Sequence, residues 1–232
     1  MAAPTILITG ANRGIGLTMT ERFAGDGWQV LACCRNPDQA HELTALCERF
    51  PAIEVHALDV VDYDRMAELA AALRDRPIDI LLSNAGIYGP RGMPFGEVTA
   101  EGWREVLEVN SIAPLMLAQA FVGSVARSER KLIAVVSSKM GSIEENKRGG
   151  GYVYRSSKTA VNQVVKSMSV DLAEQGISVI TLHPGWVRTD MGGVDAEIGT
   201  TESVDGLAGI LQTAGPAQNG QFFNYTGEVI PW

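Results

Sequence analysis

A tyrosine and a lysine four residues apart are the side chains in this sequence best suited to proton transfer. Residues 154–158 read YRSSK, and on a helix this spacing places Tyr154 and Lys158 on one face, about one turn apart. A free phenol has a pKa near ~10, and each unit of lowering corresponds to ~1.4 kcal/mol, so proton exchange at neutral pH needs a cation beside the phenolate. Lys158 supplies that cation, whereas Tyr152, six residues from Lys158, faces away from it. The pair predicts an acid/base centre, with accidental packing as the alternative.

A glycine-rich turn follows the first predicted strand. Residues 9–17 read TGANRGIGL, a GxxxGxG spacing rather than GxGxxG. Glycines permit the tight turn and let a pyrophosphate approach the N–H groups at the start of the next helix. An ordinary glycine-rich turn is the alternative. The predicted dinucleotide-binding positions here are Gly10, Asn12, Arg13, Gly14, Ile15 and Gly16.

The segment after the second predicted strand favours NADP(H) over NAD(H). Proteins that bind NAD usually carry an acid there, roughly 20 residues beyond the glycine motif, to bind the ribose hydroxyls. Residues 34–36 read CRN instead, and Asp38 is better explained as a helix-capping residue. Arg13 and Arg35 could grip a 2′-phosphate, with two solvated arginines as the alternative.

Five motifs occur in one fixed order along the chain. They are the glycine turn at 9–16, SNAG at 83–86, VSS at 136–138, YRSSK at 154–158 and HPG at 183–185. In this order they resemble the short-chain dehydrogenase/reductases over essentially the whole chain. Residues 137–143, residues 183–191 and the tail GEVIPW at 227–232 look most like the C-factor-like group, which includes sniffer-type carbonyl reductases.

The resemblance implies an NAD(P)-dependent oxidoreductase with Tyr154 as its acid/base. Lys158 would lower the pKa of the tyrosine and bind the nicotinamide ribose, and Ser138 would hold the substrate oxygen. Asn110 would anchor a water of the proton relay, although an amide here could equally satisfy backbone groups.

The same resemblance implies the remaining cofactor contacts. They are Asp59 and Val60 beside adenine, Asn84, Ala85 and Gly86 beside the adenine ribose, and Pro184, Gly185, Val187 and Thr189 beside the nicotinamide. The alternatives are a helix-capping role for Asp59 and packing of the central strand for the residues at 84–86. His183 is expected to be structural, because neither the mechanism nor a metal spacing requires it.

Two serines compete for the position that holds the substrate oxygen. The resemblance places this serine about a dozen residues before the tyrosine, and Ser142 is twelve residues before Tyr154. The predicted strand at 132–136 runs directly into Ser137 and Ser138, and a strand end meets the ~0.5 Å tolerance of a catalytic group better than a loop does. Extra residues in the loop at 141–151 cost little closure entropy. We therefore predict Ser138.

Apolar, β-rich runs alternate with helical patterns from end to end. The runs lie at 6–8, 29–34, 53–58, 78–82, 132–136, 178–182 and 221–225, and the helical patterns at 15–24, 39–49, 65–74, 103–126 and 159–173. Most runs are apolar on both faces, as in a parallel sheet covered on both sides. The predicted fold is a single α/β domain over residues 1–232, with a doubly wound (Rossmann), predominantly parallel seven-stranded sheet. Such sheets bind ligands at the carboxyl ends of their strands, so the loops near 86–96, 141–151 and 185–201 are the predicted walls of the substrate site.

Candidate substrate-lining residues in these loops are apolar and partly aromatic. They are Ile87, Tyr88, Met93, Ile143, Tyr152, Trp186, Met191 and Val194, and each could instead pack in the core or in a lid. The set favours a hydrophobic ketone or aldehyde as substrate. The leading hypothesis is an NADPH-dependent carbonyl reductase or alcohol dehydrogenase. The alternative is a nucleotide-binding signalling or sensor protein of C-factor type, which would not need the residue types found at 110, 138, 154 and 158.

Charge and cysteine usage narrow the possible partners. Twenty-seven acidic against nineteen basic residues give a formal charge of −8, which disfavours nucleic acid and anionic membranes as partners. The three cysteines, Cys33, Cys34 and Cys47, form no CxxC pair and have no metal-ligand spacing. We expect a reduced, cytoplasmic protein without a metal site.

No segment of the sequence has the pattern of a membrane-spanning helix or of a secretory signal. Residues 1–5 lack basic side chains and lead into only three apolar residues, so no secretory signal is expected. The longest apolar stretch, 111–126, is shorter than a membrane span and is expected to form a buried helix.

Two predicted helices, at 103–126 and 159–173, carry more apolar surface than one sheet face readily covers. The residues concerned are Leu115, Leu117, Phe121, Val161, Val164, Val165 and Met168. The surplus predicts a homodimer or homotetramer, with packing inside one chain as the alternative.

Overall fold

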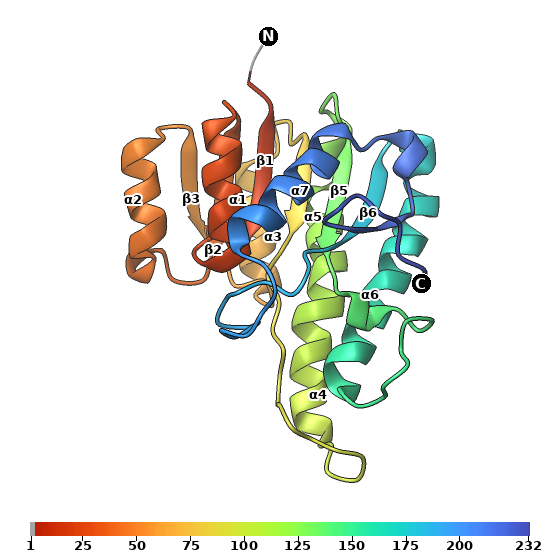
Figure 1. Cartoon of the computed structure of the whole chain (residues 1–232). Helices are drawn as coiled ribbons and strands as arrows, with labels where there is room; N and C mark the ends of the chain where they lie inside the picture. The colour runs from red at the N-terminus through yellow and green to blue at the C-terminus, as the bar shows by residue number, and fades with distance from the viewer. Residues whose placement is uncertain (1–2) are drawn as a thin grey trace.

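A parallel sheet forms the centre of the computed structural model, which describes residues 3–232 (Figure 1). Residues 1 and 2 of the N-terminal segment lie outside the described residues. The strands lie in the order β3 (Ile53–Ala57), β2 (Gln29–Cys34), β1 (Thr5–Thr9), β4 (Ile80–Ser83), β5 (Leu132–Val136), β6 (Ser178–His183) and β7 (Phe222–Asn224), and every neighbouring pair is parallel. The chain starts in the middle of the sheet and winds outward in both directions, so the predicted doubly wound α/β fold is confirmed.

Alternate side chains of each strand feed two cores, one on each face of the sheet. Ile6 and Ile8 of β1 pack with α1 (Gly14–Gly25), α2 (His41–Arg49) and α7 (Thr200–Thr213). Leu7 packs on the other face with α3 (Tyr63–Ala72), α5 (Ala113–Ala126) and α6 (Tyr152–Asp171). Because both faces are covered, the strands are apolar throughout rather than alternating.

Helix α7 is an element for which the sequence pattern predicts no helix. It joins β6 to β7, as a crossover between parallel strands requires. Its 14 residues include Gly206 and Gly209, which weaken a helical pattern. A Cβ on Gly206 would lie 2.1 Å from the main-chain oxygen of Tyr225, so this glycine lets the helix approach the chain beyond β7.

The predicted helix at 103–126 begins earlier than expected. Helix α4 (Ala100–Leu107), a π-helical turn (Glu108–Ile112) and α5 form one run of 27 residues. This run is longer than the apolar stretch suggested, and by length and composition alone it could cross a membrane. Half of its most apolar window is buried inside the structure, where Leu117 and Phe121 pack against the sheet.

Most of the apolar residues expected to pair copies of the chain lie in its own core. Leu117, Phe121, Val161, Val165 and Met168 are all buried, and the two remaining residues, at 115 and 164, are partly buried against the same core. The argument from surplus apolar surface is therefore wrong for these residues, because the long helices lie against the sheet and against each other.

Candidate active site

Tyr154 and Lys158 lie on the first two turns of α6, on one face as their spacing predicts. The Lys158 Nζ is 5.7 Å from the centroid of the Tyr154 ring, and both residues are buried. The ammonium donates a hydrogen bond of 2.9 Å to the main-chain oxygen of Val136. This bond fixes the lysine to the carboxyl end of β5.

Burial dominates the protonation of both residues. It raises the pKa of Tyr154 to about 12, against a hydrogen bond from Ser138 that lowers it and a smaller contribution from Tyr88 that raises it. Burial also lowers the pKa of Lys158 to about 8. The resemblance implies that Lys158 lowers the pKa of Tyr154, whereas the largest influence on that pKa in this structure is desolvation by burial, which raises it.

Ser138 and Ser142 have different surroundings. Ser138, the second residue after β5, has an extended backbone and caps a 3-10 turn (Lys139–Gly141), and its Oγ accepts the N–H of Met140 at 3.2 Å. Its hydroxyl is near enough to the Tyr154 phenol to lower the pKa of Tyr154. The Ser142 hydroxyl donates instead to the main-chain oxygen of Trp232 at 3.0 Å, and the residue is only 1% exposed.

Asn110 lies in the π-helical turn, and its side chain is fully used by protein groups. The amide nitrogen donates to the main-chain oxygen of Ile87 at 2.8 Å and to the Ser157 hydroxyl at 3.0 Å, while the amide oxygen accepts the Ile87 N–H at 2.9 Å. A Cβ on Gly86 would lie 3.2 Å from the Asn110 oxygen and 3.5 Å from the Lys158 Nζ. Gly86, Asn110 and Lys158 therefore border one space.

The glycine turn forms a cradle at the start of α1. Gly10 and Gly14 adopt left-handed backbone angles, with φ of 66° and 53°. A Cβ on Gly16 would lie 2.1 Å from the main-chain oxygen of Gly10, so only glycine permits this approach. The first N–H groups of α1 have no partner within the helix and point toward the turn. These residues fit the pyrophosphate of a dinucleotide.

Asn84 ties the SNAG segment to the glycine turn. Its amide nitrogen donates to the main-chain oxygens of Thr9 and Gly10 at 2.9 and 3.2 Å, and the Thr9 hydroxyl accepts the N–H groups of Asn84 and Ala85. The segment from Asn84 to Gly86 thus runs from the cradle toward Lys158. Its side chains do more than pack the central strand.

The segment at 184–189 meets the same cradle from the other side. Thr189 Cγ2 lies 3.2 Å from the position of a Cβ on Gly14. Pro184 accepts the Ser203 hydroxyl at 2.6 Å, Gly185 has a φ of 85°, and Val187 is buried. These contacts therefore bring Thr189 to the glycine turn, while Pro184 is tied to α7 through Ser203.

An ion pair that no sequence pattern indicated joins the two segments. Arg13 Nη1 lies 2.9 Å from Asp190 Oδ2, with both side chains largely exposed. The residues are 177 positions apart in sequence. Since no local spacing relates them, only the fold could reveal the pair.

Arg35 and Asp59 lie at the carboxyl ends of β2 and β3, beside the cradle. Arg35 is exposed. Asp59, followed by Val60, accepts the N–H of Val61 at 3.2 Å, while Asp62 caps α3. Asp59 thus shapes the turn after β3 and lies at the edge of the sheet where Arg13 and Arg35 lie.

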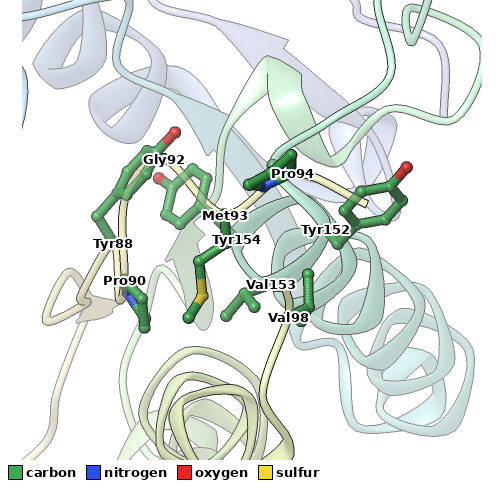
Figure 2. Close-up of a pocket in the computed structure, with 10 residues that line it drawn as sticks. Tyr88, Pro90, Gly92, Met93, Pro94, Val98, Tyr152, Val153 and Tyr154 are labelled. Carbon is green, nitrogen blue, oxygen red and sulfur yellow. The ribbon is translucent and has the colours of Figure 1, made fainter. Parts of the chain in front are cut away.

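A cavity of about 400 Å³ opens beside Tyr154. Figure 2 shows the rings of Tyr88 and Tyr154 facing each other at one wall, with Met93 and Val153 near them. The two rings are stacked, with centroids 4.5 Å apart and planes inclined by 19°. The lining residues are Tyr88, Pro90, Gly92, Met93, Pro94, Val98, Gly151, Tyr152, Val153 and Tyr154.

The cavity uses part of the predicted lining set. Tyr88, Met93 and Tyr152 line it, and the others do not. Ile143, Trp186, Met191 and Val194 are partly or largely exposed. The sequence pattern missed the prolines and valines of the wall, because such residues give no signal of their own without the fold.

His183 is the last residue of β6. Its Nδ1 is buried and has no hydrogen-bond partner among residues 3–232. Burial, with a smaller effect of Lys139, lowers the pKa of His183 to about 4, so the imidazole is neutral. No group of three or more His, Cys, Asp or Glu side chains in the described part of the chain is arranged to hold a metal ion.

The order of these elements matches a known family of enzymes. The family model described as short chain dehydrogenase matches residues 4–197. The chain belongs to this family of oxidoreductases. The structure of the carbonyl reductase Sniffer of D. melanogaster is similar, with 35% identity, a TM-score of 0.93 and full coverage of both chains. An NADPH-bound carbonyl reductase from chicken fatty liver has 32% identity, a TM-score of 0.93 and the same coverage.

A bacterial relative is similar over part of this short-chain dehydrogenase. The C-signal of Myxococcus xanthus is 38% identical over 156 residues, which cover 67% of this chain and 93% of that protein. The predicted likeness to the sniffer-type and C-factor-like group is confirmed by these three relatives.

Proposed function

We propose that this short-chain dehydrogenase is an NADPH-dependent carbonyl reductase, and that it also oxidises the corresponding alcohol. The observation that carries the proposal is the buried phenol of Tyr154, which lines the cavity and whose pKa the nearby Ser138 hydroxyl lowers. A carbonyl oxygen bound at these two hydroxyls would accept one hydrogen bond from each.

The proposed proton path runs through the side chains of this chain. Ser138 holds the carbonyl oxygen, and Tyr154 donates its proton to that oxygen as charge develops there. The raised pKa of Tyr154 keeps the phenol protonated until this step. Lys158, with a pKa of about 8, can then return a proton to the phenolate. A Cβ on Gly86 would lie 3.5 Å from the Lys158 Nζ and 3.2 Å from the side-chain oxygen of Asn110. Bound NADPH would supply the hydride for the carbonyl carbon.

The residues of the cradle fit the cofactor in this proposal. Gly14 to Gly16 would bind the pyrophosphate at the start of α1. Asp59 and Val60 would border adenine, residues 84–86 and Lys158 the two riboses, and residues 184–189 the nicotinamide. Arg35, exposed at the end of β2, and Arg13, which would exchange its ion pair with Asp190, would bind a 2′-phosphate, and the chicken relative was solved with NADPH bound.

The proposed substrate is a hydrophobic ketone or aldehyde. The cavity wall carries no charged side chain and consists mainly of aromatic, proline, valine and methionine residues. A charged substrate would leave an unpaired charge against this wall, which is costly.

A signalling or sensor role without catalysis is not favoured, since such a protein would not need the Ser138 hydroxyl beside the Tyr154 phenol. A cytoplasmic location agrees with three free cysteines.

We also propose that the chain forms a homodimer or homotetramer, whose mass can be measured by light scattering.

The test is turnover by Tyr154→Phe on a panel of ketones, aldehydes and quinones, followed by NADPH absorbance. The wild type should reduce at least one class, and the variant should lose about a thousandfold or more of kcat/KM because only the proton donor is removed. NADPH binding, measured by fluorescence, should be retained. Tyr225→Phe is the matched control, because Tyr225 is exposed at its hydroxyl. Substantial activity in Tyr154→Phe would overturn the mechanism.

A further inference from the structure

The turn after Ser138 is fastened to α6 on one side. The Thr159 hydroxyl donates to the main-chain oxygen of Gly141 at 2.9 Å, and the Asn162 amide donates to the same oxygen at 3.3 Å. A Cβ on Gly141 would lie 2.7 Å from the carbonyl carbon of Lys158. The turn therefore lies directly against the helix that carries Tyr154 and Lys158.

The last residue of the sequence fastens the same turn on its other side. The main-chain oxygen of Trp232 accepts the N–H of Ile143 at 2.8 Å, the N–H of Glu144 at 3.3 Å and the Ser142 hydroxyl at 3.0 Å. Ser142 Oγ also accepts the N–H of Glu145 at 3.2 Å. A buried hydroxyl with both a donor and an acceptor partner is held in one orientation.

The tail is itself anchored to the edge of the sheet. The Trp232 ring stacks on Phe222 of β7, with centroids 5.5 Å apart and planes inclined by 20°. The Ile230 N–H donates to the main-chain oxygen of Phe222 at 2.7 Å, and Val229 bridges to Phe223 in antiparallel fashion. Figure 1 shows the C-terminal end beside the segment that leads from β5 into α6.

The remainder of this loop offers little restraint. Residues 149–151 are three consecutive glycines, all with left-handed φ values of 58° to 66°. Glycine has the largest backbone freedom of any residue. The connection from Ser138 to Tyr154 along the chain is therefore loose at its far end. The contacts at its near end set their relative position together with the hydrogen bonds that join Ser137 and Val136 to α6.

We propose that Ser142 and Trp232 are positioning residues that hold the turn after Ser138 against α6, so that the Ser138 hydroxyl stays at the Tyr154 phenol. The inference rests on the proposed function of Ser138 and Tyr154. A catalytic group needs placement to within ~0.5 Å, and Ser138 and Tyr154 belong to different elements. The oxygen of Trp232, with three donors from residues 142–144, connects β7 to that turn.

Ser142→Ala and Trp232→Ala test the proposal. Each should lower kcat about tenfold, less than the ~10²-fold loss that a misplacement of 1 Å can cause. NADPH affinity should be unchanged, because the cradle lies on β1, four positions from β7 in the sheet. The conservative variants Ser142→Thr and Trp232→Phe, which keep the hydroxyl and the stacked ring, should restore most of kcat. Val229→Ala is the matched tail control, since its side chain is 61% exposed.

A double-mutant cycle separates positioning from general loss of structure. If Ser142 acts through Ser138, then Ser142→Ala should change kcat by less than about twofold in a Ser138→Ala background. An equal loss in both backgrounds would overturn the proposal. Activity is expressed per NADPH-binding site, so that unfolded protein in a sample does not lower the measured kcat.

A measurement that needs no turnover completes the test. Hydrogen exchange of the amides at 140–145 should be faster in Trp232→Ala than in wild type, whereas the amides of β1 should be unchanged. Equal exchange at 140–145 would overturn the proposal whether or not the protein reduces carbonyls. If Tyr154→Phe abolishes turnover but Ser142→Ala and Trp232→Ala keep full kcat, the positioning role fails and the proposed function stands.

Discussion

At the scale of single residues, burial sets the chemistry of the proton-transfer pair. Tyr154 and Lys158 lie on one helical face, but the pKa of Tyr154 is raised to about 12 and the pKa of Lys158 is lowered to about 8, mainly by desolvation. The lysine donates to Val136 rather than to the phenol. The pair is therefore held in the state that donates a proton, and the lysine is the group that titrates near neutral pH.

The lowered pKa of Lys158 makes the stability of the cofactor-free protein depend on pH. Between pH 8 and pH 10 the folded protein has lost a proton that the unfolded chain keeps up to its pKa of 10.5. The unfolded state then binds more protons at this residue, so the contribution of Lys158 to the free energy of unfolding rises with pH in this window. Lys158→Met should lack this rise and should be more stable at pH 7, by up to about 3 kcal/mol less the hydrogen bond to Val136.

Urea unfolding at a series of pH values checks this prediction. Lys166→Met is the control, because Lys166 lies on the same helix with its side chain exposed. The quantity compared is the stability of the wild type minus that of Lys158→Met at each pH, because the raised pKa values of Cys33, Cys34 and Cys47 make the stability of both proteins fall as pH rises through the same window. A difference that is flat or falling between pH 8 and pH 10 would contradict the lowered pKa of Lys158.

Arg35 is the residue on which cofactor choice is expected to depend. The wild type should prefer NADPH over NADH in kcat/KM, because guanidinium groups bind a 2′-phosphate by charge-assisted hydrogen bonds. Arg35→Asp should lower kcat/KM with NADPH by roughly 10- to 100-fold, in line with about 1.5–3 kcal/mol for such a bond. The preference for NADPH over NADH should therefore narrow. Arg74→Asp is the control, since Arg74 is exposed at the end of α3. Equal use of both cofactors by the wild type would refute this prediction.

At the scale of elements, the glycine turn shows how one missing side chain positions a strand and a helix. The start of α1 approaches the end of β1 so closely that a Cβ on Gly16 would lie 2.1 Å from Gly10 O and 2.6 Å from the Asn84 amide nitrogen. Something must move if that Cβ is added. The same approach creates the cradle for the pyrophosphate, so stability and cofactor binding share one cause.

Gly16→Ala should therefore weaken both properties. We expect a loss of about 1–3 kcal/mol in the free energy of unfolding from overpacking, and a loss of at least about tenfold in NADPH affinity because the cradle is displaced. Gly25→Ala, in the same helix, should be neutral or stabilising by up to about 1 kcal/mol, since a Cβ there meets nothing within 4 Å. Urea unfolding and NADPH titration check both variants, and equal behaviour of the two would contradict the steric argument.

At the scale of the whole molecule, the two long helices leave less apolar surface than their sequences suggest. Five of the seven residues expected to pair copies are buried in the core. The large apolar side chains that remain exposed on this part of the fold include Ile112 and Val170, at 44% and 64% exposure. Single exposed apolar side chains are normal on a monomer, so these two residues only mark positions at which a contact between copies can be tested.

The chain is still predicted to form a homodimer or homotetramer. Light scattering at micromolar concentration should report a mass of two or four times the 24.8 kDa chain, because most soluble oligomers are symmetric assemblies of one chain. Ile112→Glu and Val170→Glu should shift the population toward the monomer, whereas Glu174→Gln should not. A wild-type mass of one chain would refute the oligomer.

The sequence alone determined those features of this protein that depend on short-range spacing. Strands and helices alternate at the predicted places, apart from α7, because apolar periodicity reflects burial on each element. The YRSSK spacing placed Tyr154 and Lys158 on one helical face, and the glycines at 10, 14 and 16 predicted the tight turn before α1.

Only the tertiary structure decided which side chains meet across the chain. It joined Ser142 to Trp232 over 90 residues and Arg13 to Asp190 over 177 residues, placed the Ser138 hydroxyl at Tyr154, and built the cavity wall from residues with no motif of their own. It also set the pKa values of Tyr154 and Lys158, because burial depends on every element packed around a residue. Such contacts depend on how the sheet and its helices pack together, and no local sequence pattern encodes the distance between residues that are far apart in the chain.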